Sequence, residues 1–190
     1  MFDQYISDLK ILLDKLECSS GDEPIGVAEA VERVVALIEE IYKDGRKIYW
    51  IGNGGSAAIA EHSALDYFRT GNIKSQAFND GPMLTCLGND FGYPAVFQKP
   101  VSLFLERNDI LVAISSSGRS VNILNAVAAA KDNGGLVITL SGFAADNPLR
   151  GLGHYNFYAP SNRYGEVELA HGILCHAFLD LYMARRNGGR

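Results

Sequence analysis

Apolar residues recur along this chain at two different periods, and the two periods alternate. Residues 2–19 and 26–44 carry apolar side chains every three or four positions, which predicts two amphipathic helices. Further along, continuous apolar runs predict buried strands at residues 47–51, 110–114 and 136–140. Weaker patterns predict short strands at residues 75–78 and 155–158. Helical spacing returns between these strands and after the last one, at residues 57–68, 81–86, 94–105, 121–133 and 164–186.

This alternation predicts an α/β fold built on a doubly wound parallel sheet. We expect a single domain over residues 1–190, made of an N-terminal helical pair (1–45) and an α/β core (46–190). Turn-forming residues at 19–24 separate the two helices, and residues 88–92 are predicted to form a loop. The helical pair has apolar faces to cover, so it packs either on its own sheet or against another subunit.

The composition narrows the range of functions. The net charge of −5 argues against a broad basic surface for nucleic acid. No apolar run approaches the ~18 residues of a membrane span, and residues 1–5 lack the basic and apolar regions of a signal peptide. The cysteines, Cys18, Cys86 and Cys175, form no CxxC pair, so we expect small core residues in a reduced, cytoplasmic protein.

A glycine-rich turn joins the first core strand to the next helix, in the stretch Gly52-Asn53-Gly54-Gly55-Ser56. A helix N-terminus has unpaired backbone N–H groups and a partial positive charge. Glycines let an anion approach those groups closely, so the stretch predicts a cradle for a phosphate or a carboxylate. The alternative is a plain strand-to-helix turn in which Ser56 is the N-cap.

A second loop, rich in hydroxyl groups, follows the strand at 110–114. Four hydroxyls stand directly before the next predicted helix, on Ser115, Ser116, Ser117 and Ser120. Hydroxyls together with free N–H groups suit a dianionic phosphoryl group, whereas the alternative is simple helix capping. Neither loop has the lysine of a P-loop or the spacing of GxGxxG. A sugar phosphate at the carboxyl edge of the sheet is therefore favoured over a nucleotide.

Two helices carry further titratable residues. His62 and Asp66 lie four residues apart on one face of the first core helix, where the alternative is a surface pair. On the last helix, Glu168 and His176 are the two residues that we favour as acting together. The alternative for Glu168 alone is a solvated carboxylate. His171 points elsewhere and is interpreted as a core or supporting histidine. If the helices meet, the four residues other than His171 offer two imidazoles and two carboxylates, which suits Zn²⁺ or another borderline divalent metal.

The ordered set of motifs resembles the phosphoheptose isomerases, the sedoheptulose 7-phosphate isomerase branch of the sugar-isomerase (SIS) domain proteins. The similarity covers nearly the whole chain, through residues 52–56, 62, 88–92, 114–122, 168, 171 and 176. It implies a three-layer α/β/α sandwich of flavodoxin-like or Rossmann-like topology, with a five-stranded parallel sheet. It also implies a homotetramer whose active sites lie at subunit interfaces, with the N-terminal helical pair used in oligomer packing.

The activity that this resemblance implies is conversion of sedoheptulose 7-phosphate to D-glycero-D-manno-heptose 7-phosphate through an enediol(ate). This step leads to nucleotide-activated heptose for lipopolysaccharide or capsule. By matching positions, the sugar phosphate would be held by Asn53, Gly54, Gly55, Ser56, Ser115, Ser116, Ser117 and Ser120. The sugar would be contacted by Asp90 and Glu168. One Zn²⁺ per subunit would be bound by His62, Asp66, Glu168 and His176, with Asp66 and His176 as the acid/base pair.

Three positions depart from the family pattern. Asp66 stands where the family has Glu, which draws the base back by about one methylene group. Glu168 stands where the family has Gln, which adds a negative charge to the site. The family's Gly-Arg pair after the first core helix is shifted and reads Phe68-Arg69-Thr70 here.

These departures keep two alternatives open. One is an isomerase for another sugar phosphate, and the other is a non-catalytic SIS-type binding protein, like the tetramer that associates with the replication initiator. A sugar-phosphate sensor is disfavoured because no basic helix-turn-helix segment is visible. We expect a sugar-phosphate substrate, and neither a membrane nor a nucleic acid as partner.

Overall fold

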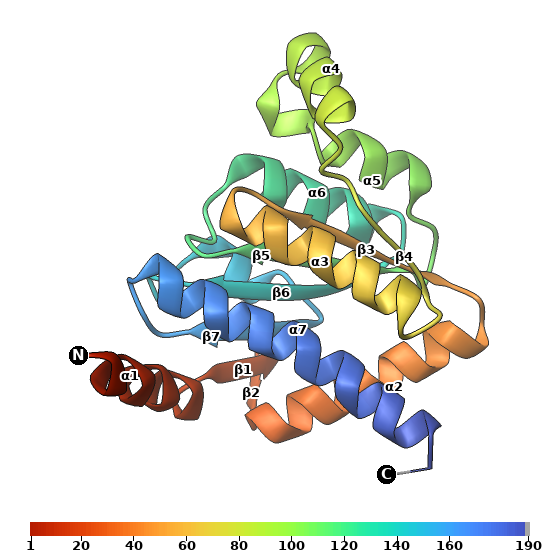
Figure 1. Ribbon diagram of the computed structural model, residues 1–190. Coiled ribbons are helices and arrows are strands. Elements are labelled where there is room, and N and C mark those ends of the chain that lie inside the picture. The colour runs from red at the N-terminus through yellow and green to blue at the C-terminus, as the bar shows by residue number, and fades with distance from the viewer. Residues whose placement is uncertain (189–190) are drawn as a thin grey trace.

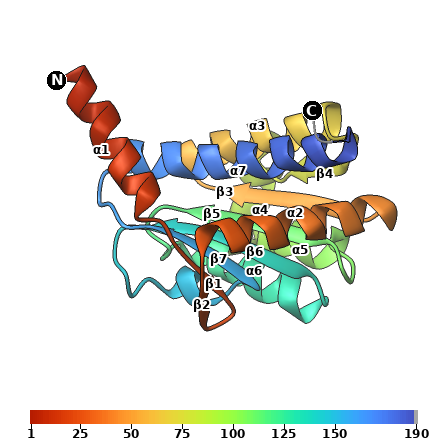
Figure 2. The same ribbon diagram turned by 90° about the horizontal axis from the view of Figure 1, so that it is seen from below.

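The computed structural model describes residues 1–188 and has three layers, with one β-sheet between two layers of helices (Figures 1 and 2). Its helices are α1 (Phe2–Asp14), α2 (Val27–Lys43), α3 (Gly55–Arg69), α4 (Gly81–Phe91), α5 (Gln98–Phe104), α6 (Val121–Asp132) and α7 (Tyr164–Arg186), with short 3₁₀ turns η1 (Tyr93–Ala95) and η2 (Pro148–Gly151). Its strands are β1 (Glu17–Ser20), β2 (Glu23–Ile25), β3 (Lys47–Gly52), β4 (Lys74–Ala77), β5 (Ile110–Ser115), β6 (Leu136–Gly142) and β7 (Tyr155–Ala159).

The described residues form one sheet with the strand order β2-β1-β7-β6-β5-β3-β4. All neighbours from β7 to β4 pair in parallel, which confirms the predicted α/β/α class and its five parallel strands. The other two strands, β1 and β2, are antiparallel additions that the sequence pattern did not predict.

Alternate side chains of the central strands fill two separate cores. Ile48 and Trp50 of β3 belong to the core under α2, α3 and α7, whereas Tyr49 and Ile51 belong to the core under α5 and α6. This is the period-2 alternation of a strand buried on both faces. Strands β3 and β5 are neighbours with Gly52 opposite Ile114, so both strands deliver their loops to the same edge of the sheet.

The N-terminal segment differs from the prediction of two helices separated by a turn. Helix α1 ends at Asp14, and Glu17–Ser20 pairs with β7, which places Cys18 opposite Phe157 in the buried core. Long-range pairing of this kind overrides a local helical pattern. Helix α2 buries its apolar face in its own chain, whereas α1 leaves Phe2 and Ile6 exposed.

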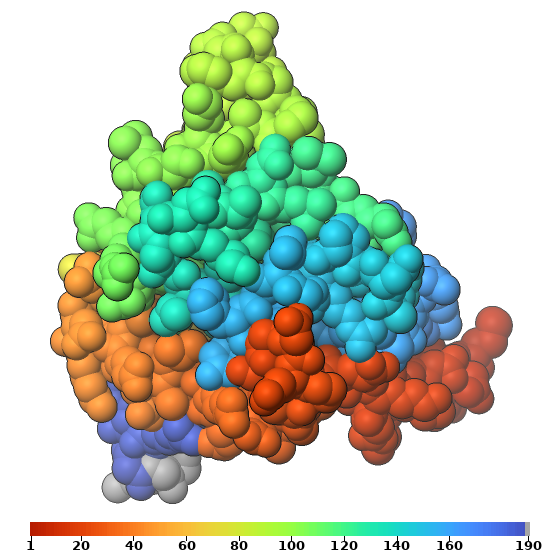
Figure 3. Space-filling view, turned by 180° about the vertical axis from the view of Figure 1, so that it is seen from behind, coloured from red at the N-terminus to blue at the C-terminus, as the bar shows by residue number. Residues whose placement is uncertain are grey.

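Helix α4 projects from the body of the molecule, at the top of Figures 1 and 3. It runs without a break from Gly81 to Phe91, so the prediction of a loop at 88–92 was wrong. The helix begins where Asp80 accepts a hydrogen bond from the Met83 N–H, at 3.0 Å, and it ends at Gly92, whose φ is 80°. The stabilisation from this N-cap thus outweighs the low helix propensity of Gly88 and Asn89.

Two predictions drawn from composition have different outcomes. Within residues 1–188, none of the helices combines the length and the apolar character needed to cross a membrane. All three cysteines are free thiols, and Cys18 and Cys175 are buried as predicted. Cys86 is exposed on α4, so its prediction as a core residue was wrong. It lies on the projecting helix, which carries no buried residue in the described chain.

Candidate active site

The glycine loop and the serine loop lie side by side at the carboxyl edge of the sheet. Strands β3 and β5 end at Gly52 and Ser115, and helices α3 and α6 begin at Gly55 and Val121. Two helix N-termini, each with unpaired N–H groups, therefore border one cavity of about 240 Å³. It is lined by Asn53, Gly54, Gly55, Ser56, Ser115, Ser116, Ser117, Ser120, Tyr164 and Glu168.

The serine hydroxyls in this cavity have unequal roles. Those of Ser115 and Ser117 accept hydrogen bonds from the backbone N–H groups of Gly118 and Arg119, at 3.2 and 3.3 Å, and so shape the loop. Ser116 is 5% exposed, and within residues 1–188 its Oγ has no hydrogen-bond partner. A buried hydroxyl left without a partner is costly, so this group is suited to a ligand oxygen.

Ser56 is not the N-cap of α3. The helix begins one residue earlier, with Gly54 as its N-cap at φ 57°, and Ser56 is buried in the first turn. A positive φ is readily adopted by glycine, so Gly54 allows the backbone to turn into the helix with its N–H groups toward the cavity edge. The alternative of a plain strand-to-helix turn is therefore wrong in naming Ser56 as the N-cap.

Three of the four residues proposed for a metal ion lie together between α3 and α7. Nε2 of His62 is 3.1 Å from Oδ2 of Asp66, and Nδ1 of His176 is 3.8 Å from the same oxygen. One ligand atom from each residue lies within 4.8 Å of the other two. The two imidazoles are about half exposed and Asp66 is 23% exposed, so the group is open to a ligand from solvent.

Glu168 lies outside this three-residue group. It stands two helical turns before His176 on α7, and its carboxylate lies against Gly55 at the N-terminus of α3, where a Cβ would overlap it. It lines both the serine-loop cavity and an adjoining hollow of about 630 Å³, which also contains His62 and His176. The helix dipole stabilises the carboxylate there, and its charge opposes an incoming phosphate.

Within residues 1–188, Asp90 lies at neither the serine-loop cavity nor the adjoining hollow. It lies on the projecting helix α4, where its carboxylate accepts hydrogen bonds from Cys86 and Asn89. Neither cavity formed by residues 1–188 includes Asp90 in its lining. Its predicted contact with the sugar stays a prediction.

His171 is a core residue, in agreement with its interpretation from the sequence. It is completely buried, and its Nε2–H donates to the Ser141 carbonyl at 3.1 Å, while Nδ1 has no partner within residues 1–188. Burial lowers the pKa of His171 to about 4, although the bond to Ser141 acts in the opposite direction.

This lowered pKa predicts a loss of stability in mild acid. The folded state keeps His171 neutral, so the stability it confers is complete above the unfolded pKa of 6.5 and is lost as pH falls toward about 4. Between pH 7 and pH 5 the wild type should lose about 2 kcal/mol of unfolding free energy more than His171→Gln. Urea unfolding at both pH values measures this. Equal losses in the two proteins would contradict the assignment.

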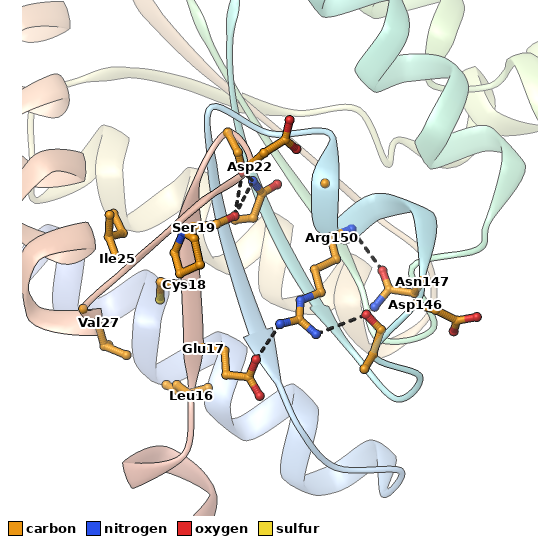
Figure 4. A pocket seen from close by; sticks show the side chains of 16 residues that line it. Leu16, Glu17, Cys18, Ser19, Asp22, Ile25, Val27, Asp146, Asn147 and Arg150 are labelled. Carbon is orange, nitrogen blue, oxygen red and sulfur yellow. Dashed lines mark hydrogen bonds and ion pairs between the residues drawn. The ribbon is translucent and has the colours of Figure 1, made fainter.

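A further hollow of about 570 Å³ lies between the β1–β2 hairpin and η2 (Figure 4). Arg150 is bonded within it: it pairs with Glu17 at 2.5 Å and donates to the Ala145 backbone carbonyl at 3.1 Å. Asn147 accepts from the Arg150 N–H at 3.1 Å. We interpret this hollow as a structural contact between the β1–β2 hairpin and η2. It contains none of the predicted site residues.

Some residues at the site were not predicted from the sequence. Tyr164 lines the serine-loop cavity from the start of α7. Tyr93 and Asn122 hydrogen-bond to the side chain of Asn53, which also lines the cavity. Asn122 is one of the residues that carry the family resemblance, but it was given no role at the site. For the two tyrosines the sequence offers no comparable signal.

Comparison with known proteins gives a consistent result. The SIS domain family matches residues 25–142. The chain is 34% identical over 161 residues to a phosphoheptose isomerase of Aliarcobacter butzleri, covering 80% of this chain and 84% of that one. It is 31% identical over 182 residues to a phosphoheptose isomerase of Aneurinibacillus thermoaerophilus, covering 93% and 90%. The solved phosphoheptose isomerase GmhA of Neisseria gonorrhoeae is similar at a TM-score of 0.80 and 29% identity, covering 95% and 97%.

Proposed function

Because this chain belongs to the SIS domain family, and within it to the phosphoheptose isomerases, we propose that it isomerises sedoheptulose 7-phosphate to D-glycero-D-manno-heptose 7-phosphate. The observation that carries the proposal is the junction of two cavities. A phosphate-sized cavity with two helix N-termini and an unpartnered serine hydroxyl adjoins a hollow that contains His62, His176 and the nearby Asp66.

The phosphate end of the substrate binds in the serine-loop cavity. Free N–H groups of α3 and α6 and the Ser116 hydroxyl donate to its oxygens. Binding energy from this end, remote from the reacting carbons, orients C1 and C2 toward α7. Gly54 and Gly55 add no side chains that would block the approach.

The proton transfers belong to Asp66 and His176. Asp66 takes a proton from C1 of the ketose, and His62, at 3.1 Å, holds its carboxylate in place. The C2 oxygen gains a proton and the C1 hydroxyl loses one, so that C1 becomes the aldehyde carbon, and C2 receives its proton from His176, which lies 3.8 Å from the same carboxylate. Proton exchange with solvent then returns Asp66 and His176 to their starting states. One base and one acid facing a shared space are what an aldose–ketose isomerisation requires.

A divalent metal ion fits the same three residues. Two imidazoles and one carboxylate within 4.8 Å match the ligand preference of Zn²⁺, and such a site leaves a coordination position open. When bound, Zn²⁺ would stabilise negative charge that develops on the substrate oxygens. We place His62, Asp66 and His176 as the ligands and leave Glu168, two turns away, as a substrate-facing carboxylate.

The active assembly is proposed to be a homotetramer with sites at subunit interfaces. Leu169 and Ile173 of α7 line the reaction hollow and are exposed, and α3 also exposes Leu65 and Phe68. Exposed apolar groups gathered beside a hollow favour a protein partner. A partner could also bring its α4, with Asp90, to this site. Free thiols at Cys18, Cys86 and Cys175 fit a cytoplasmic location for this single-domain enzyme.

Incubation of the purified protein with sedoheptulose 7-phosphate tests the proposal. We expect aldose 7-phosphate to form, about one zinc per chain by elemental analysis, and loss of activity on chelation with recovery on adding Zn²⁺. His62→Ala should lose the metal, whereas Glu61→Gln on the exposed side of α3 should keep it. Phosphate binding without any turnover, with metal bound, would instead indicate a non-catalytic SIS protein.

A further inference from the structure

The two phosphate-binding loops are joined by a reciprocal pair of side-chain amides. Asn53, in the glycine loop, donates from Nδ2 to Oδ1 of Asn122 at 3.0 Å. Asn122, at the start of α6, donates from its own Nδ2 to Oδ1 of Asn53 at 2.9 Å. Asn122 is 3% exposed, so one side of the pair is buried. The pair links the loop after β3 to the start of α6.

One backbone group indicates the direction of the bonds in this network. The N–H of Ile123 can only donate; it donates to the Ser120 carbonyl at 3.0 Å and also lies 3.1 Å from Oδ1 of Asn122, where an NH₂ group would be repelled. This fixes the oxygen of Asn122 on that side and turns its NH₂ group toward Asn53. The oxygen of Asn53 must therefore face Asn122, which leaves the Tyr93 hydroxyl, 2.9 Å from that oxygen, as a donor.

Tyr93 brings in a third segment. It is the first residue of η1, directly after α4 and Gly92, and its side chain is 56% exposed. The Asn53 oxygen thus accepts two hydrogen bonds, from Asn122 and from Tyr93. The hydrogen bond from Tyr93 therefore attaches the segment that follows helix α4 to the glycine loop.

We propose that Asn122 and Tyr93 are positioning residues, which hold Asn53 and thereby set the spacing of the glycine loop from the serine loop. A phosphate that contacts both loops needs that spacing fixed before it binds. Without the two donors the Asn53 amide is free to rotate, and the loop must be ordered again when the anion binds. Neither residue touches the reacting carbons, so the effect falls on binding and not on proton transfer.

Inorganic phosphate titrated into the full-length protein by calorimetry tests this. We expect Tyr93→Phe to weaken phosphate binding roughly three- to tenfold, as for loss of one hydrogen bond. It should raise KM for sedoheptulose 7-phosphate by the same factor while kcat stays within about twofold. Asn122→Ala should have the larger effect. Because Asn122 is buried, Tyr93→Phe decides the question alone if the alanine variant does not fold.

A control on the same helix separates positioning from general anchoring. Asn125 of α6 donates from Nδ2 to the Pro94 carbonyl of η1 at 3.1 Å, and Asn125→Ala removes this contact while both donors to Asn53 remain. We expect it to weaken phosphate binding less than Tyr93→Phe does. In the double variant, Tyr93→Phe and Asn122→Ala should be less than additive, because both act through one oxygen.

The inference rests on the proposed function only for the choice of anion. Wild-type phosphate binding with no isomerase activity would overturn the function and leave the inference standing. Unchanged phosphate affinity in Tyr93→Phe, or an equal loss in Asn125→Ala, would overturn the inference and leave the function standing. A wild type that binds no phosphate would overturn both.

Discussion

Asp66→Asn is expected to lower kcat for sedoheptulose 7-phosphate by about 10³-fold or more, with little change in fold. General-base catalysis contributes about 10²–10⁴-fold in rate, and an amide cannot accept the C1 proton. The amide has nearly the same shape as the carboxylate, and Asp66 is partly exposed, so we expect the melting temperature to stay within a few degrees. Kinetics at saturating substrate and a thermal melt measure the two quantities.

Two matched variants make the Asp66 result specific. Glu61→Gln makes the same carboxylate-to-amide change on an exposed position of α3 and should leave kcat unchanged. Asp66→Glu restores a carboxylate with a longer reach and should keep substantial activity. Elemental analysis of Asp66→Asn shows whether metal is lost as well, because the same oxygen faces His62 and His176. Turnover at the wild-type rate in a metal-loaded Asp66→Asn would rule Asp66 out as the base.

The core of the fold was predictable from the sequence because its signals are local. The central parallel strands β5 and β6 are largely continuous apolar runs, and α7 was predicted with the bounds that the structure shows. The β1–β2 hairpin was not predictable in this way. Its residues pair with β7, more than a hundred residues away, and Cys18 opposite Phe157 leaves no local pattern. Helix α4 was missed at its end because Gly88 and Asn89 resemble a turn.

The residues of the candidate site could be predicted from the sequence, but their arrangement in space could not. His62 and Asp66 share a helix face by spacing alone, but their approach to His176 depends on how α3 and α7 pack. The same packing places Glu168 against Gly55 and outside the group of His62, Asp66 and His176, which spacing along one helix could not show. Tyr93 reaches Asn53 across forty residues of sequence. Long-range contacts of this kind require the tertiary structure.

Gly52→Ala is expected to have the largest effect on the structure of the phosphate site. Gly52 ends β3, and a Cβ there would overlap the carbonyl group of Ser56 and approach the Ala57 nitrogen in the first turn of α3. These are backbone atoms, so only movement of the helix start can relieve the overlap. We expect a loss of about 2–3 kcal/mol in unfolding free energy, roughly 5–10 °C in melting temperature.

The same movement should also remove phosphate binding, because the first turn of α3 carries the N–H groups that face the cavity. We expect at least about a tenfold weaker affinity for inorganic phosphate at a temperature where the variant is still folded. Gly81→Ala is the matched control, since a Cβ at the start of α4 meets no atom of the described chain within 4 Å. It should match the wild type in both measurements. If Gly52→Ala also matched the wild type, the close approach of β3 to α3 could not be what fixes the cradle, and the anion would have to be held by the serine loop alone.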